Sequence, residues 1–213
     1  MTPLLRSRVV ACLPALALSL GSLTGIAQAA PLTVSVADAD GKPLAQAVVY
    51  VMVHGTKALA EAGTTGQIGQ RERQFTPQVN VIQTGTAVSF PNFDTVRHHV
   101  YSFSPIQKFE LKLYAGTPAA PVVFDKPGTA VLGCNIHDRM NAWVHVVDTP
   151  LFTKTDATGK ALLEVPAGDH KLRTWHPLLP EPALPVEQAL HMNAAATQAA
   201  VKLPVHATAS GTP

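Results

Sequence analysis

The segment 133–140 carries three side chains with metal-binding chemistry at a fixed spacing. Cys134 offers a thiolate, His137 an imidazole and Met140 a thioether, in the pattern C-x2-H-x2-M. Soft sulfur and imidazole donors favour copper over hard cations, and a trigonal plane of one Cys and two His with a weak axial Met is the ligand set of blue-copper centres. The spacing therefore predicts three of the four ligands of a mononuclear copper site in one short loop.

The fourth ligand is expected from an earlier strand that lies beside this loop. Two adjacent histidines, His98 and His99, compete for the position. Because successive residues of a strand face opposite sides, only one of the two can point toward Cys134. The alternation alone leaves both candidates open.

The first 29 residues have the pattern of a secretory signal peptide. Arg6 and Arg8 form a basic start, an apolar stretch follows at 9–23, and Ala-Gln-Ala at 27–29 is a cleavage site of the A-x-A type. The apolar stretch is short for a membrane span of about 20 residues. We therefore expect a cleaved signal, a periplasmic protein, and no stable membrane insertion after the signal is removed.

Charge and cysteine content narrow the choice of partners. Without the two leader arginines, 14 Lys and Arg balance 14 Asp and Glu, and no basic run remains. A neutral chain without a basic run is not expected to bind nucleic acid or an anionic membrane. Cys12 would leave with the signal, so Cys134 has no cysteine to pair with in the mature chain.

The remaining chain of about 184 residues is long enough for one large domain or two small ones. Short apolar runs bounded by turn residues predict an all-β sandwich, with helix plausible only at 58–62 and at 186–200, where strand and turn are an alternative. The expected strands are residues 32–37, 47–53, 79–83, 87–90, 99–103, 130–133, 142–147, 162–165, 171–175 and 201–205.

The two ends of the chain resemble pieces of one small sandwich, of the transthyretin-like or carboxypeptidase-regulatory-like kind. The motif V-x-D-x-x-G-x-P-L stands at 36–44, and T-D-x-x-G followed by P-x-G stands within 155–168. Insertion of a domain at an exposed turn is tolerated. The resemblance predicts a sandwich made of residues 30–55 plus 149–206, a linker at 56–69, an inserted or appended domain at 70–148, and a loose tail at 207–213.

The central part of the chain resembles the cupredoxin family, to which plastocyanin and amicyanin belong. The shared motifs are F-x-P at 75–77, G-x-x-V-x-F-x-N at 85–92, a His soon after that Asn, a P-G turn at 127–128, and the loop that begins at Cys134. The short interval from His137 to Met140 is similar to that of amicyanin. The whole chain also resembles exported proteins labelled methylamine utilisation protein. The fold implied is a cupredoxin Greek-key β-sandwich joined to the smaller sandwich.

The resemblance also implies a ligand set. The family's H-N-V triplet aligns with residues 98–100, which makes His98 the ligand and leaves His99 as the alternative. His98, Cys134 and His137 would form the plane around one type 1 copper ion, with Met140 as the axial donor. His99 then stands where the family has an Asn that braces the cysteine loop.

The function implied is that of an exported blue-copper protein, which shuttles single electrons between redox partner proteins in the periplasm. The exposed edge of His137 would be the exit for electrons. An enzyme is not expected, because copper oxidases and nitrite reductases of this fold need a His beside the cysteine, whereas Gly133 and Asn135 flank Cys134. Two alternatives remain, a copper-binding or copper-delivery protein without an electron-transfer role and a metal-free interaction module.

Overall fold

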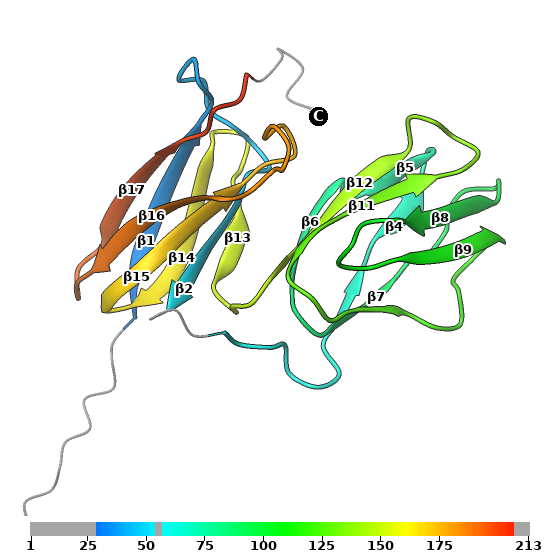
Figure 1. Ribbon diagram of the computed structural model, residues 1–213, viewed down its shortest axis with the longest axis horizontal. Helices are drawn as coiled ribbons and strands as arrows, with labels where there is room; N and C mark the ends of the chain where they lie inside the picture. The colour runs from blue at the N-terminus through cyan, green and yellow to red at the C-terminus, as the bar shows by residue number, and fades with distance from the viewer. Residues whose placement is uncertain (1–28, 54–56, 207–213) are drawn as a thin grey trace, which may run out of the picture.

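The structure is a computed structural model that describes residues 29–53 and 57–206, and its regular elements there are all β-strands (Figure 1). The all-β prediction is confirmed. The helical option at 58–62 is wrong, and residues 186–200 hold two strands instead of a helix. In this part of the chain no helix is long and apolar enough to cross a membrane. The predicted signal peptide, except Ala29, and the predicted tail lie outside the described residues.

Strands from both ends of the chain share one hydrophobic core. One sheet has the order β14-β1-β17 and the other the order β13-β2-β15-β16. Alternate residues of β1, among them Leu32 and Val34, are fully buried in a cluster that includes Leu172 and Trp175 of β15. The strands are β1 (Ala29–Ala37), β2 (Val48–Val53), β13 (Phe152–Lys154), β14 (Lys160–Pro166), β15 (Gly168–Trp175), β16 (Val186–Met192) and β17 (Thr197–Lys202).

The strands between β2 and β13 surround a second core, which is separate from the first and lies on the right in Figure 1. Their sheets have the orders β6-β12-β11-β8-β9, β10-β7-β3 and β4-β5. Phe90, Phe124 and Leu132 fill this core. The strands are β3 (Thr65–Gln67), β4 (Gly69–Arg71), β5 (Gln74–Thr76), β6 (Val79–Gln83), β7 (Thr86–Ser89), β8 (His98–Ser102), β9 (Phe109–Tyr114), β10 (Val122–Phe124), β11 (Gly128–Cys134) and β12 (Asn141–Val147).

The described part of the segment 56–69, which was predicted as a linker, contributes to this second core. Its strand β3 pairs in parallel with β7, and Ile68 is buried in the cluster. A buried apolar side chain and a paired backbone fix the end of this segment in place.

Two turns of the type D-x-x-G-K close strand connections in the first pair of sheets. Asp38 and Asp156 each accept hydrogen bonds on Oδ1 from the backbone N–H groups two and four residues later, at 2.8–3.0 Å. Gly41 and Gly159 follow with φ of 83° and 72°, a region in which only glycine is unstrained. They differ in surroundings, since a Cβ on Gly159 would lie 2.6 Å from the carbonyl oxygen of Val36, whereas one on Gly41 would meet nothing within 4 Å.

Gly159→Ala is therefore expected to destabilise the protein more than Gly41→Ala. Both changes force an L residue into the left-handed region at a cost of about 1–2 kcal/mol, but only Gly159→Ala also displaces a backbone carbonyl. Urea unfolding of the two variants measures the difference. Equal losses would show that the backbone around Val36 moves aside at no cost.

The two halves of the protein contact each other through β6 and β12. Val79 of β6 and Val147 of β12 are buried in the first core, although their strands belong to the second half. Lys154 of β13 donates a hydrogen bond from Nζ to the carbonyl oxygen of Val79 at 2.6 Å. These contacts join the two halves through apolar packing and a hydrogen bond.

A group of aromatic rings lies on the face of β12 that also carries Val147. His145 stacks on Trp175 of β15, with ring centroids 4.7 Å apart and planes 14° apart, and Tyr50 of β2 lies 5.6 Å from it. The Nδ1 atom of His145 is 2.9 Å from the hydroxyl of Thr129. Burial disfavours the charged ring and lowers the pKa of His145 from 6.5 to about 3. His145 is therefore neutral at physiological pH.

This buried ring predicts a loss of stability in acid. Between pH 6.5 and about 3 the unfolded chain takes up a proton on His145 that the folded chain refuses, so stability falls as pH falls through that window and is constant below it. His145→Phe should reduce the slope of the free energy of unfolding by about 1.4 kcal/mol per pH unit. Denaturant unfolding from pH 7 to 4 measures it.

His191→Gln is the matched control, because the side chain of His191 is 73% exposed. It should leave the slope as in the wild type. An unchanged slope in His145→Phe would mean that the buried ring does take up a proton in the folded state.

Candidate metal centre

Strand pairing brings His98 and Cys134 to the same place. Cys134 is the last residue of β11, which pairs antiparallel with β8 so that Cys134 stands opposite Val100. His98, the first residue of β8, and Val100 are both fully buried, and His99 between them is 8% exposed. Residues two positions apart on a strand face the same side, so His98 and Val100 share a face. The side chain of His98 thus lies in the second core beside that of Cys134.

The loop after Cys134 folds back on itself, so that His137 and Met140 lie near Cys134. The N–H of Met140 donates to the carbonyl oxygen of His137 at 2.9 Å, and the N–H of Cys134 donates to that of Met140 at 3.2 Å. These backbone hydrogen bonds hold His137 and Met140 at the end of β11. The short spacing in the sequence is what permits so tight a return.

The three predicted planar ligands form one group. The Sγ atom of Cys134 is 3.9 Å from Nδ1 of His98 and 3.7 Å from Nδ1 of His137, and the ligand atoms of the three residues all lie within 4.8 Å of one another. With metal–nitrogen and metal–sulfur distances of about 2.0 and 2.3 Å, ligands 120° apart are about 3.7 Å from each other. The spacing fits a trigonal metal site.

Within the described residues, no other group of three or more His, Cys, Asp or Glu side chains has ligand atoms this close together. Cys134 is buried and unpaired, and His137 is partly exposed. A single soft thiolate with two imidazoles in this setting is a donor set for copper or zinc.

Met140 lies next to this group. It is 1% exposed and belongs to the same hydrophobic cluster as Cys134. It also lines a surface depression together with Cys134 and a second one together with His137. A thioether at this place favours copper over zinc, because Met is a ligand for soft metals.

His99, the alternative to His98, does not join the group. Its Nε2 atom lies 3.0 Å from Oε1 of Glu110 on β9, and its ring meets that of Tyr101 edge-on with centroids 6.2 Å apart. His99 therefore faces the outer side of β8, where Tyr101 also lies.

Asp94 is a site residue that the sequence analysis missed. Its Oδ2 atom lies 2.7 Å from Nε2 of His98, and its two carboxylate oxygens accept backbone N–H groups of Glu72 and Arg73 at 2.6 and 2.9 Å. The signal was present in the sequence, since an acidic residue four positions before a predicted His ligand can reach its outer nitrogen. Ligand histidines usually donate their second N–H to such a partner.

This contact decides which nitrogen of His98 faces the cysteine. Desolvation alone would raise the pKa of Asp94, but hydrogen bonds from Arg73, His98 and Glu72 outweigh it and lower that pKa. An ionised carboxylate only accepts, so Nε2 of His98 carries the hydrogen in this contact. Its Nδ1 lone pair is then directed toward Cys134 and free to bind a metal.

Asn92 fixes the backbone that carries Asp94. Its side-chain nitrogen donates to the carbonyl oxygens of Val96 and Tyr114 at 2.8 and 3.0 Å, and its side-chain oxygen accepts the N–H of Asp94 at 2.9 Å. Asn92 is 5% exposed, so these bonds are shielded from water. The loop between β7 and β8 is thereby held to β9.

A glycine precedes Cys134 for a steric reason. The ring of Tyr101 lies across Gly133, where a Cβ would be 2.6 Å from Cζ of Tyr101. The two residues stand opposite each other in the β8–β11 ladder. Any other residue at position 133 must move either the tyrosine or the strand end that carries Cys134.

Several solved structures resemble this chain over part of its length. A purple cupredoxin from Nitrosopumilus maritimus is 24% identical, with 38% of this chain and 98% of the cupredoxin covered and a TM-score of 0.35. An amicyanin from Paracoccus versutus is 16% identical, with 46% and 96% covered and a TM-score of 0.33. A copper-containing nitrite reductase from Thermus scotoductus SA-01 is 25% identical over 54% of this chain, but the match spans 28% of the reductase, with a TM-score of 0.37.

No protein-family model matches the chain, and no curated protein matches it. At TM-scores of this size the structural likenesses carry no argument, so the case for a metal centre rests on the contacts described above. The transthyretin-like identity of the first pair of sheets and the likeness to methylamine utilisation proteins stay predictions.

Asp94→Asn is expected to weaken metal binding without unfolding the protein. The amide keeps the shape of the carboxylate but no longer fixes the His98 hydrogen on Nε2, and loss of such a partner typically costs about 10–100-fold in metal affinity. Competition for Cu(I) with a chromophoric chelator measures the affinity. Asp125→Asn, at an exposed position of the same half, should bind as the wild type does. Equal affinity in the Asp94 variant would show that His98 needs no such partner.

Proposed function

We propose that this chain is an exported type 1 copper protein that carries single electrons. The observation that supports it most is the spacing of His98, Cys134 and His137, whose ligand atoms lie within 4.8 Å of one another, close enough to bind one ion. Met140 is the proposed axial ligand. One copper ion per chain would supply the one-electron chemistry by cycling between Cu(I) and Cu(II).

The protein's own contribution is to hold these four side chains still. His98 is fixed by Asp94, Cys134 by the β8–β11 ladder, and the loop that carries His137 and Met140 by its backbone hydrogen bonds. A site that does not rearrange when the charge of the ion changes suits electron transfer, because little reorganisation accompanies each step. The thiol proton of Cys134 is displaced when the metal binds.

The surface near the site offers a route for electrons. His137 is partly exposed, and Ile136 beside it is 47% exposed to solvent. Asn135 and Asp138 are exposed as well. We take this loop as the face that meets redox partners, which we expect in the periplasm. Its apolar centre is small, as suits contacts that form and separate quickly.

The same donors could serve copper storage or delivery, and a catalyst is less well supported. Gly133 and Asn135 flank Cys134, so no histidine beside the cysteine links this site to a second metal. Export stays a prediction, because the residues of the proposed signal peptide lie outside the described part of the chain.

Titration of the purified mature protein with Cu(II) tests the proposal. We expect an intense thiolate-to-copper absorption band and narrow copper hyperfine splitting in the electron paramagnetic resonance spectrum, both saturating at one copper per chain. Cyclic voltammetry should then give a reversible one-electron wave. A coloured site without that wave, with rapid loss of copper to a chelator, would indicate delivery; the absence of colour would leave a metal-free module.

Single variants assign the ligands. Cys134→Ser should abolish the band, His98→Ala should abolish or strongly alter it, and Met140→Leu should keep the band and shift the reduction potential, which the axial ligand tunes. His99→Ala is the matched control and should keep both band and potential. Loss of the band in His99→Ala with retention in His98→Ala would contradict the proposed ligand set.

A further inference from the structure

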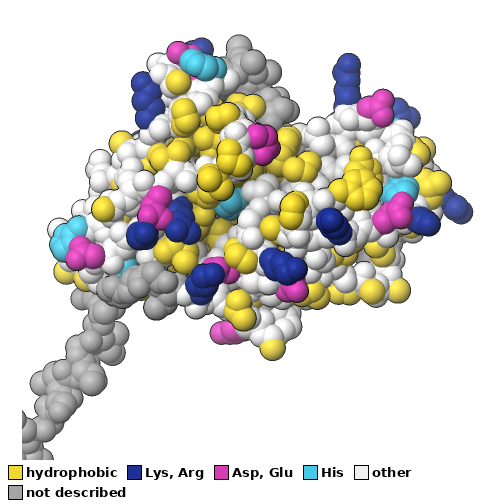
Figure 2. Space-filling view, in the orientation of Figure 1, with side chains coloured by type: hydrophobic (Ala, Val, Ile, Leu, Met, Phe, Trp, Pro, Cys, Tyr) yellow, Lys and Arg dark blue, Asp and Glu magenta, His cyan; other side chains and the backbone are white. Residues whose placement is uncertain are grey.

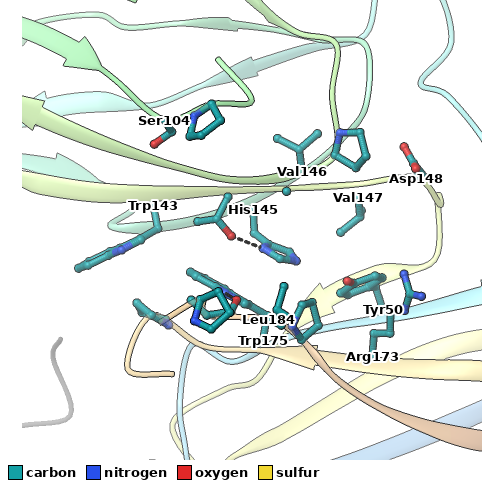
Figure 3. A pocket seen from close by; sticks show the side chains of 18 of the residues that line it. Tyr50, Ser104, Trp143, His145, Val146, Val147, Asp148, Arg173, Trp175 and Leu184 are labelled. Carbon is teal, nitrogen blue, oxygen red and sulfur yellow. Dashed lines mark hydrogen bonds between the residues drawn. The ribbon is translucent and has the colours of Figure 1, made fainter. Parts of the chain in front are cut away.

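The rings at the hollow between the two halves pack on one another. Hydrophobic side chains gather along this hollow in the space-filling view (Figure 2). Figure 3 shows His145 of one half beside Trp175 and Tyr50 of the other, and all three side chains are buried. Arg173, at the same hollow, pairs with Glu187 at 2.7 Å. These groups already serve the contact between the halves.

Arginines gather instead in the part of the second half that surrounds the candidate metal centre. The chain has five arginines and nine lysines after residue 29. Four of the arginines, and none of the lysines, lie in the three short segments 71–74, 93–97 and 135–139. They are Arg71, Arg73, Arg97 and Arg139. The three segments together are called the arginine face below.

The three segments are neighbours in space. Glu72 and Arg73, in the turn between β4 and β5, line one surface depression together with residues 94–96. The same two residues line a second depression together with residues 137–140. The partly exposed His137 belongs to this second depression. The arginine face is therefore one continuous surface that includes a proposed metal ligand.

The arginines of this face have no partners for their charge. All four are exposed, and none of them forms an ion pair within residues 29–53 and 57–206. Glu72 and Asp138 are the exposed acids of the face, whereas the carboxylate of Asp94 binds His98 and two backbone N–H groups. The exposed side chains thus carry four positive and two negative charges, although residues 30–213 as a whole carry 14 of each sign.

Apolar side chains lie among these charges. Phe93, Val96 and Ile136 are exposed large hydrophobic residues of the face. The guanidinium carbon of Arg71 lies 5.0 Å from the centre of the Phe93 ring, so this cation rests on an apolar surface. Protein interfaces are enriched in arginine and aromatic side chains and depleted in lysine. The composition of the arginine face therefore fits a protein partner.

We propose that the arginine face binds an acidic surface of a redox partner protein. Carboxylates of the partner pair with the four arginines, whose planar groups can donate two parallel hydrogen bonds to a carboxylate. The partner's redox group then lies near His137. The proposal rests on the proposed electron-transfer function, and it adds the sign of the partner's charge. Complementary charges of this kind speed the encounter and fix its orientation.

Binding of poly-L-glutamate to the metal-free protein tests the surface without redox chemistry. In amide proton–nitrogen correlation spectra at low salt, the signals of residues 71–74, 93–97 and 135–139 should shift most. The shifts should vanish at about 0.2 M NaCl, where the screening length is below about 8 Å. Shifts that spread evenly over the protein, or the absence of shifts at low salt, would overturn the proposal.

A pair of double variants separates the position of the charges from their number. Arg73→Gln with Arg139→Gln should bind poly-L-glutamate about fivefold more weakly at low salt, as expected for two exposed charge pairs. The backbone N–H of residue 73 that binds Asp94 remains. Lys108→Gln with Lys126→Gln removes the same charge from exposed positions of the same half outside the arginine face and should bind as the wild type does. Equal weakening in both double variants would refute a specific surface.

Electron transfer to small oxidants of opposite charge supplies the second test. The reduced, copper-loaded protein gives one electron to hexacyanoferrate(III) or to tris(phenanthroline)cobalt(III), so that Cu(I) becomes Cu(II) and the oxidant's metal goes from the III to the II state. Added salt should slow the reaction with the anionic iron complex and speed the reaction with the cationic cobalt complex. The opposite salt effects would overturn the proposal. Failure to take up redox-active copper would contradict the proposed function instead, and the poly-L-glutamate experiment would still decide whether the face binds acidic groups.

Discussion

The antiparallel pairing of β8 with β11 is the constraint on which the candidate metal centre depends. It places Cys134 opposite Val100 and therefore turns His98, two residues earlier, into the same core. A slip of one residue would turn His99 inward and His98 out to Glu110, because side chains alternate along a strand. The register is held by the buried residues Ala130, Leu132 and Cys134 that alternate along β11, by Val100 of β8 in the same core, and by the close contact of Tyr101 with Gly133.

Asp94 ties this pairing to a distant part of the chain. The same carboxylate that orients His98 also accepts the N–H groups of Glu72 and Arg73 in the turn between β4 and β5. Both turn residues have positive φ, 54° and 59°, although neither is glycine. The carboxylate thus stabilises a strained turn and the orientation of His98 at once, and it places the edge of the β4–β5 sheet beside the candidate centre.

The β11–β12 ladder connects the candidate metal centre with the contact between the two halves. Cys134 ends β11, while Thr129 of the same strand stands opposite His145 of β12. His145 in turn stacks on Trp175 of the other half. One pair of strands therefore carries Cys134 of the candidate centre at one end and a ring of the contact between the halves near the other. The halves meet over rings and a neutral imidazole as well as over closely packed aliphatic side chains.

The sequence by itself determined the all-β class, most of the long strands, and the group of donors in the cysteine loop, because two-residue alternation and short-range ligand spacing are local patterns. The strand at 79–83 was predicted to the residue, whereas the short strands β3, β4, β5 and β13 and the exposed β9 and β10 were missed, since three-residue or half-exposed strands leave little periodic signal. Only the tertiary structure decided that His98 and not His99 faces Cys134, that Asp94 orients it, and that His145 stacks on Trp175 of the other half. Each of these depends on which strands lie side by side, and that follows from packing over long separations in sequence.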